Sequence, residues 1–200
     1  MRIERYHGDL LKITKGPTTL FYPCPVALVT CSDETGKDDI VTLAWIGVAN
    51  STPPMIAAGI RPTRYSASLI DRTGEFVVNI PSVELLEKTD YCGSVSGTDV
   101  TKFESTGFTR EKASQVKAPM IRECPVNLEC RVKQKLVLGS HQLYLGEVLE
   151  THVDQNVLNP DGNIDYAKAQ PFVYNTREYW NLGRKLQVHG FSKTLKQEAK

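Results

Sequence analysis

The chain has 200 residues, of which 40% are hydrophobic and 24% are charged, and its formal net charge is +1. This composition is typical of a globular protein whose core needs no disulfide or metal ion to be stable. The low net charge argues against a nucleic-acid-binding protein that relies on a broad basic surface. No run of about 18 apolar residues is present, so no membrane-spanning helix is expected. The first residues lack the apolar core of a signal peptide, which predicts a cytoplasmic protein.

The five cysteines predict neither a disulfide framework nor a metal site. Their number is odd, and no CxxC pair is present. Disulfide-rich domains and zinc sites need paired or closely spaced cysteines. We therefore expect no metal, and we expect the cysteines to be buried as small hydrophobic residues.

The first part of the chain is typical of antiparallel strands joined by short connections. The valine-rich run 24–31 predicts a strand, and the charged segment 32–39 predicts its turn. Residues 40–49 predict a longer second strand that a Ser-Thr-Pro-Pro break ends, and residues 55–60 predict a third. Short connections favour antiparallel pairing of these neighbours.

Short helices then alternate with a strand. Residues 64–71 predict a helix with Thr63 as its N-cap and an end near Gly74. Residues 75–82 predict a strand, and residues 83–93 predict a second helix.

A polar, glycine-rich segment separates this part from the clearest strand signal. Residues 93–109 predict a loop and a short helix that Thr98 or Asp99 would cap. In residues 126–133 apolar and polar side chains alternate strictly, which predicts a strand with one polar face. A Gly-Ser turn and a returning strand over 141–153 complete a hairpin.

The last predicted strand lies within residues 171–175, which gives about six to eight strands in all. A closed or nearly closed barrel would leave few strand edges to protect. The fold class is therefore mainly β, with short helices inserted into an antiparallel barrel. We expect one domain over residues 1–200, with a core of about 10–175 and a C-terminal extension of about 176–200.

Arg61, Arg64 and Ser66 cluster at the start of the first predicted helix. Helix N-termini present unpaired N–H groups and a partial positive charge, and arginine forks bind phosphate oxygens well. These residues predict a phosphate-binding site. The alternative is two surface arginines that flank a proline turn.

The strand before this helix favours a flat ligand. Thr42, Ala44 and Trp45 precede a break at Ala49, Asn50 and Ser51. Small residues let a flat ring lie against the backbone, and the polar residues offer hydrogen bonds to a ring edge. Together with the arginines they predict a planar cofactor with a phosphate tail. The alternative is that Trp45 belongs to the core and the break is only a turn.

Other catalytic classes lack their motifs. GxSxG, HExxH, the Walker loop and the dinucleotide-binding fingerprint after a strand are all absent. His141, at a strand start, is either a core or edge histidine or a donor near a cofactor ring. Lys102, after the glycine-rich loop, is either solvated or in contact with an anionic cofactor.

Several segments, in this order, resemble the flavin reductase-like family of FMN-binding split barrels, and within it the flavoredoxin branch. The matching segments are "PCPVALVTC", "VTLAWIGVANSTPPMIAAGIRPTRYSASLI", "GEFVVNIP", "DYCGSVSGTDVTKF" followed by "GFT", and "GSHQLYLGEVLE". The resemblance covers roughly residues 10–185. It implies a Greek-key split barrel, a homodimer, and noncovalent FMN near the subunit interface.

The resemblance also assigns roles by position. Thr42, Ala44 and Trp45 would line the isoalloxazine. Asn50 and Ser51 would meet its polar edge or the ribityl chain. Residues 61 and 64–66 would hold the ribityl and phosphate, Lys102 would reach the flavin from its own or the neighbouring subunit, and His141 would lie where a hydride donor docks. The implied cofactor-binding residues are Thr42, Leu43, Ala44, Trp45, Ala49, Asn50, Ser51, Arg61, Arg64, Tyr65, Ser66 and Lys102.

Three functions stay open at this point. The first is an oxidoreductase that passes electrons from NAD(P)H through bound FMN to free flavin, ferric iron or a redox protein, with His141 orienting the donor. The second is a flavoredoxin-type electron carrier that a partner protein reduces; its docking surface would be the tail residues Tyr179, Trp180, Arg184 and Lys185, which could instead pack across the dimer. The third is a cofactor-free barrel that binds another ligand. None involves nucleic acid or a membrane.

Overall fold

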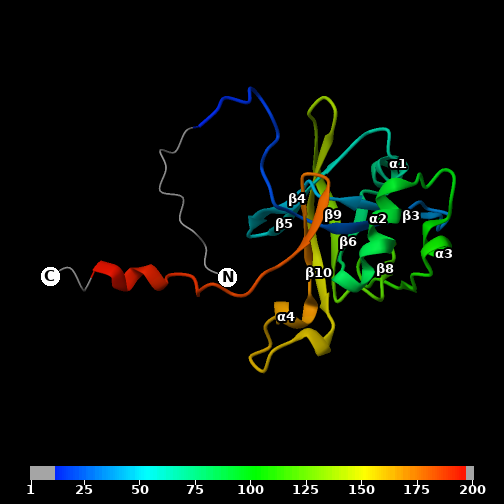
Figure 1. Cartoon of the computed structure of the whole chain (residues 1–200). Coiled ribbons are helices and arrows are strands. Elements are labelled where there is room, and N and C mark those ends of the chain that lie inside the picture. The colour runs from blue at the N-terminus through cyan, green and yellow to red at the C-terminus, as the bar shows by residue number, and fades with distance from the viewer. Residues whose placement is uncertain (1–11, 197–200) are drawn as a thin grey trace.

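Antiparallel strands dominate the computed structural model, which describes residues 12–196 (Figure 1). The strands are β1 (Cys24–Pro25), β2 (Ala27–Ser32), β3 (Asp38–Leu43), β4 (Ile46–Ser51), β5 (Pro54–Ile60), β6 (Glu75–Ile80), β7 (Arg110–Glu111), β8 (Met120–Ile121), β9 (Val126–Val137), β10 (Gln142–Val153), β11 (Phe172–Asn175) and β12 (Glu178–Asn181). The α-helices are α1 (Tyr65–Thr73), α2 (Leu86–Ser94), α3 (Lys102–Thr106) and α4 (Tyr166–Ala169), and the 3-10 helices are η1 (Val83–Leu85), η2 (Gln155–Val157) and η3 (Phe191–Lys196). Among the described residues, no helix is long and apolar enough to cross a membrane.

The main sheet has seven strands in the order β3-β2-β6-β9-β10-β5-β4. Its two outer strands, β3 and β4, are consecutive in the chain, and only Ala44 and Trp45 separate them. Three Cα steps of 3.8 Å span at most about 11 Å, so the two edges of the sheet must lie close together. At this crossing the amide of Gly59 donates to the carbonyl of Trp45 at 2.8 Å. The prediction of one continuous strand over residues 40–49 is therefore wrong.

The inside of the curled sheet holds the main core. Val29 on β2, Ile60 on β5 and Tyr144 on β10 belong to one buried cluster, which α1 completes with Leu69 and Ile70. Together with the short connection between the two outer strands, β3 and β4, this shared core shows that the sheet curls around one interior. The predicted antiparallel barrel is confirmed.

The outer face of β2 and β3 is covered by α2, α3 and the loop after them. A second cluster forms there from Leu28 and Ile40 of the strands and Cys92 and Phe103 of the helices. Like Cys92, the other four cysteines are buried and free, so their prediction as small hydrophobic residues is confirmed.

A small second sheet, β1-β11-β12, was not predicted as a unit. β1 is the beginning of the strand predicted over residues 24–31, which the structure divides into β1 and β2, and β11 lies in the strand predicted within residues 171–175. β11 pairs with β12, which falls in the segment predicted as a C-terminal extension, so residues 171–175 do not form the last strand. The described part of the chain has twelve strands rather than six to eight, because several are only two to four residues long. Strands this short leave little periodicity to recognise in a sequence.

The helix starts differ from the predictions by a few residues. The N-cap of α1 is Arg64 rather than Thr63, and that of α3 is Thr101 rather than Thr98 or Asp99. Neither cap makes a side-chain hydrogen bond to its helix. Without that bond, packing on the sheet rather than capping chemistry decides where each helix begins.

The expected polar face of β9 is wrong at Asn127 and Glu129, which are 5% and 0% exposed. The loop around residues 113–118 covers this face. The carboxylate of Glu129 accepts hydrogen bonds from the amides of Ser114, Gln115 and Val116, and His152 Nε2 lies 2.6 Å from it. Burial alone would raise the pKa of Glu129, but the hydrogen bonds from Ser114, His152 and Gln115 outweigh it and lower the pKa to about 2.

Glu129 is expected to make folding stability fall in acid. Its pKa is lower in the folded chain than its ordinary value of 4.5, so the stabilisation is complete above pH 4.5 and is lost as the pH falls toward 2. Glu129→Gln should lower the urea midpoint at pH 7 and flatten its decline between pH 4.5 and 2. Glu34→Gln, at an exposed turn position, is the matched control. An unchanged acid profile in Glu129→Gln would contradict this account.

Candidate functional site

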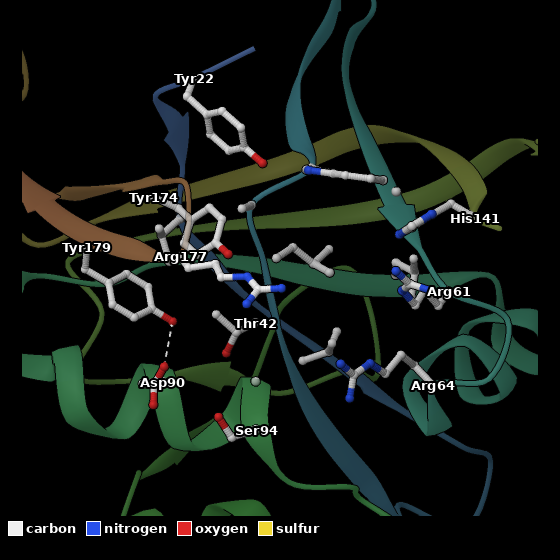
Figure 2. Close-up of a pocket in the computed structure, with 18 residues that line it drawn as sticks. Tyr22, Thr42, Arg61, Arg64, Asp90, Ser94, His141, Tyr174, Arg177 and Tyr179 are labelled. Carbon is white, nitrogen blue, oxygen red and sulfur yellow. Dashed lines mark hydrogen bonds between the residues drawn. The ribbon is translucent and has the colours of Figure 1, made fainter. Parts of the chain in front are cut away.

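A cavity of about 430 Å³ opens where the chain crosses between the two edges of the sheet. Its floor comes from β3 and the Ala44–Trp45 crossing. One wall comes from the end of β5 and the start of α1, and the opposite wall from β11, β12 and the end of α2 (Figure 2). The cavity is within the size range of small-ligand and cofactor sites.

The structure brings seven of the predicted site residues together around this cavity. They are Thr42, Leu43, Ala44, Trp45, Arg61, Arg64 and His141. Leu43 is buried against the core, while Trp45 is 43% exposed at the crossing. The hydroxyl of Thr42 donates to the carbonyl of Thr89 at 2.6 Å, so this side chain ties α2 to β3.

Arg61 and Arg64 stand at one end of the cavity, where β5 turns into α1 (Figure 2). The amide of Arg64 donates to the carbonyl of Arg61 at 3.0 Å, which closes a tight turn and places both side chains on the same side of the cavity. Both residues are exposed, and neither guanidinium has an ion pair within the described chain. Two unpaired arginines facing a cavity can bind an anion such as a phosphate.

His141 lines the same end of the cavity, beside Arg61 (Figure 2). Its ring centroid is 4.3 Å from that of Trp45, and its Nδ1 is 2.9 Å from the hydroxyl of Ser140. Burial and then the charge of Arg61 lower the pKa of His141 below its usual value. The imidazole is therefore neutral at pH 7 and can accept or donate a hydrogen bond without adding charge.

Two predicted ligand residues are buried elsewhere. Lys102 is 4% exposed, and its ammonium donates to the carbonyls of Ile40 and Cys92 and lies 3.2 Å from Asp39 Oδ1. The hydroxyl of Ser66, which is 1% exposed, donates to the other oxygen of Asp39. Neither side chain lines the cavity. Instead Lys102 joins α3 to β3 and to Cys92 near the end of α2, and Ser66 joins α1 to β3. These contacts hold in place the walls to which α1 and α2 contribute.

The remaining predicted residues also lie outside the cavity. Ala49, Asn50 and Ser51 are exposed on β4, and the side-chain Nδ2 of Asn50 donates to the carbonyl of Pro53 at 2.8 Å within the β4–β5 turn. Tyr65 packs against the core, with Lys37 Nζ 5.0 Å from its ring centroid.

The sequence analysis did not predict that the opposite wall belongs to this site. It contains Tyr22, Tyr174, Tyr179, Arg177 and Asp90 (Figure 2). The hydroxyl of Tyr179 donates to Asp90 Oδ1 at 2.9 Å, which joins β12 to α2, and burial and then this bond raise the pKa of Tyr179. Tyr179, expected on a docking surface, is half-buried here instead.

A signal for this wall was present in the sequence. The aromatic residues of "FVYNTREYWN" flank a two-residue turn, so a hairpin over residues 172–181 would place Tyr174 opposite Tyr179. The structure has this register, with the two ring centroids 5.8 Å apart.

The α2 end of this wall depends on a glycine. A Cβ on Gly93 would lie 3.1 Å from the Cβ of Thr42, which is tighter than most such contacts, so a larger residue would require α2 or β3 to shift by a few tenths of an ångström. The next residue, Ser94, lines the cavity.

The cavity therefore has cations at one end, aromatic rings on the opposite wall and an apolar floor. This arrangement suits a ligand with a flat aromatic part and an anionic tail. The described residues contain no group of three or more His, Cys, Asp or Glu side chains that could hold a metal ion.

Comparison with known proteins agrees with this description. Residues 19–183 match the model of the flavin reductase like domain. Flavoredoxin of Desulfovibrio vulgaris (Miyazaki F) is similar in structure, with a TM-score of 0.86 and 32% identity over 92% of this chain and 100% of that one. Flavoredoxin from Methanosarcina acetivorans has a TM-score of 0.84 and 32% identity over 94% of this chain and 100% of that one.

The fold is shared more widely than these two relatives. A protein from Shewanella frigidimarina with a split barrel domain has a TM-score of 0.75 at 21% identity, over 82% of this chain and 85% of that one. The barrel described above is therefore a split barrel, and the chain belongs to the flavin reductase-like domain family.

Proposed function

We propose that this chain is an FMN-dependent oxidoreductase that holds FMN noncovalently in the cavity between β3, α1 and the β11–β12 hairpin. The observation that supports the proposal most directly is the position of Arg61 and Arg64. Neither has an ion pair within the described residues, and both lie at one end of a cavity with aromatic walls in a flavin reductase-like chain. The relatives named above are flavoredoxins, and other structures of this fold are described as FMN-binding proteins.

The residues present fit this cofactor. Arg61 and Arg64 would hold the phosphate, and the apolar floor with the tyrosines would take the flat ring. Bound FMN would supply the redox chemistry, accepting a hydride and passing electrons on. The protein's own contribution is to bind and orient the cofactor and to exclude water from its buried side.

The electron donor in this proposal is NAD(P)H. His141 lies beside Trp45 at the cavity and has a lowered pKa, so it would offer a neutral hydrogen-bonding group to a nicotinamide. The acceptor would be free flavin, ferric iron or a redox protein.

A second candidate function is an electron carrier that another protein reduces. The 32% identity to two flavoredoxins favours it. Three of the four tail residues named for a docking surface are exposed, where a partner protein could reach them: Trp180 on β12, and Arg184 and Lys185 just after it.

The proposal includes a homodimer in the cytoplasm. β4 is an edge strand of the main sheet and Val48 on it is 81% exposed, beside an apolar groove of about 490 Å³ that a second copy would cover. Ala49, Asn50 and Ser51 lie on the same strand and would then reach FMN at the subunit interface. Sedimentation velocity would measure whether the chain is a homodimer in solution. The free cysteines are consistent with the reducing conditions of the cytoplasm.

Anaerobic reduction of the FMN-loaded protein tests the two functions against each other. The purified protein is loaded with FMN, and NADH and then NADPH are added while the flavin absorption is followed. Bleaching within seconds supports the oxidoreductase. Absorption that persists until a chemical reductant is added supports the carrier, and a protein that does not bind FMN contradicts both.

A further inference from the structure

The β11–β12 hairpin has an unfavourable turn. Asn175 pairs with Glu178, so the loop contains only Thr176 and Arg177, whose φ angles are +49° and +72°. Two-residue hairpin turns with positive φ at both positions strongly favour Asn-Gly, because side chains with a Cβ are strained there. A β-branched threonine followed by arginine is costly at these positions, and strain of this kind gathers at functional sites.

The strained turn places Arg177 in the cavity. Figure 2 shows its side chain between Tyr174 and Thr42, on the wall opposite Arg61 and Arg64. Its guanidinium has no ion pair or hydrogen bond within the described chain, and Asp90, the carboxylate that lines this wall, already accepts the hydroxyl of Tyr179. An unpaired cation thus faces the aromatic part of the cavity.

The cavity has two cationic regions with different surroundings: the end with Arg61 and Arg64, and the wall with Arg177. Arg61 and Arg64 follow a strand and begin a helix, away from the tyrosines, and suit a phosphate. Arg177 lies beside the rings of Tyr174 and Tyr179, where a flat ring rather than a phosphate is accommodated. A flavin ring that takes up two electrons and one proton changes from neutral to a monoanion, so a nearby cation favours the reduced form.

We propose that Arg177 sets the redox preference of this site: its charge, held in place by the strained turn, makes the protein bind the reduced, anionic flavin ring more tightly than the oxidised one. This inference rests on the proposed binding of FMN. Arg177 lies on the wall opposite Arg61 and Arg64, so it is not placed to bind the same phosphate. Its effect is on the difference in binding free energy between the oxidised and the reduced flavin ring.

The test compares the midpoint potential of bound FMN in the wild type and in Arg177→Met. The dissociation constant of oxidised FMN is expected to change less than about threefold, while binding of the reduced form weakens about tenfold more. For a two-electron couple this tenfold difference is a fall of about 30 mV in midpoint potential. Arg177→Lys should keep most of the wild-type potential, because it keeps the charge.

Two further variants separate charge from structure. Arg122→Met removes an exposed arginine outside this cavity and should leave the potential unchanged. Thr176→Asn with Arg177→Gly should raise the thermal unfolding temperature, because it relaxes the turn, yet lower the potential as much as Arg177→Met. An unshifted potential in Arg177→Met that still binds FMN overturns the inference and leaves the proposed function intact, whereas a wild type that binds no FMN overturns the function itself.

Discussion

Replacing Lys102 by methionine is expected to cost about 3–5 kcal/mol of folding stability. The Lys102 side chain is 4% exposed and that of Asp39 is 2% exposed, and their charged atoms are 3.2 Å apart. Without the ammonium, Asp39 keeps one hydrogen bond, from Ser66, and its charge stays buried without a counter-ion. The unfolding temperature should fall by roughly 6–20 °C for a chain of this size, as differential scanning calorimetry would measure.

The Lys102→Met substitution should also affect the cavity. Lys102 also donates to the carbonyl of Cys92, immediately before Gly93 and Ser94 of the α2 wall. FMN binding should therefore weaken along with stability. Asp39→Asn combined with Lys102→Met should recover part of the loss, because no charge is then left unpaired. Lys112→Met, at an exposed position, is the control, and a Lys102→Met protein as stable as this control would show that the pair does not hold the helices in place.

Replacing Arg61 and Arg64 together by methionine is expected to have the largest effect on the cofactor. Each arginine would lose a charge-assisted contact with the FMN phosphate, worth about 1.5–3 kcal/mol. Both side chains are exposed, so solvent screening favours the low end of this range. We expect the dissociation constant of FMN to rise about tenfold for each substitution and about 100-fold for both, measured by flavin fluorescence.

Riboflavin gives the decisive comparison, because it has the same ring and no phosphate. The double variant should bind riboflavin as the wild type does, and Arg122→Met, at an exposed position outside the cavity, should bind both flavins normally. Raising the salt concentration should weaken FMN binding by the wild type and leave riboflavin binding unchanged. An equal loss of both flavins in the double variant would mean that the arginines support the ring or the fold and not the phosphate.

Local patterns predicted the parts of the site that are contiguous in sequence. The run from Thr42 to Trp45 and the arginines at the start of α1 were found because residue type, strand period and proline punctuation act over a few residues. The barrel was predicted for a similar reason, since short turns between strands leave antiparallel neighbours as the simplest arrangement.

Predictions for charged side chains depended on partners that the sequence does not reveal. Lys102 and Ser66 had the chemistry of phosphate ligands, yet both meet Asp39, which is 63 and 27 residues away. Glu129 stood at a polar position of an alternating strand, yet a loop covers it. A buried charge needs a partner, and long-range packing decides which partner it has.

Neighbouring residues alone encode the antiparallel strands, the helix that follows β5, and the segment that forms the cavity floor with its two arginines, so these parts could be predicted. The break of the strand at Ala44–Trp45, and the distant hairpin that supplies the opposite wall with Arg177, became apparent only from the folded chain. The physical reason is that a sheet closes through contacts between distant strands. Which residues meet across a closed sheet depends on its register and curvature, and no local pattern contains them.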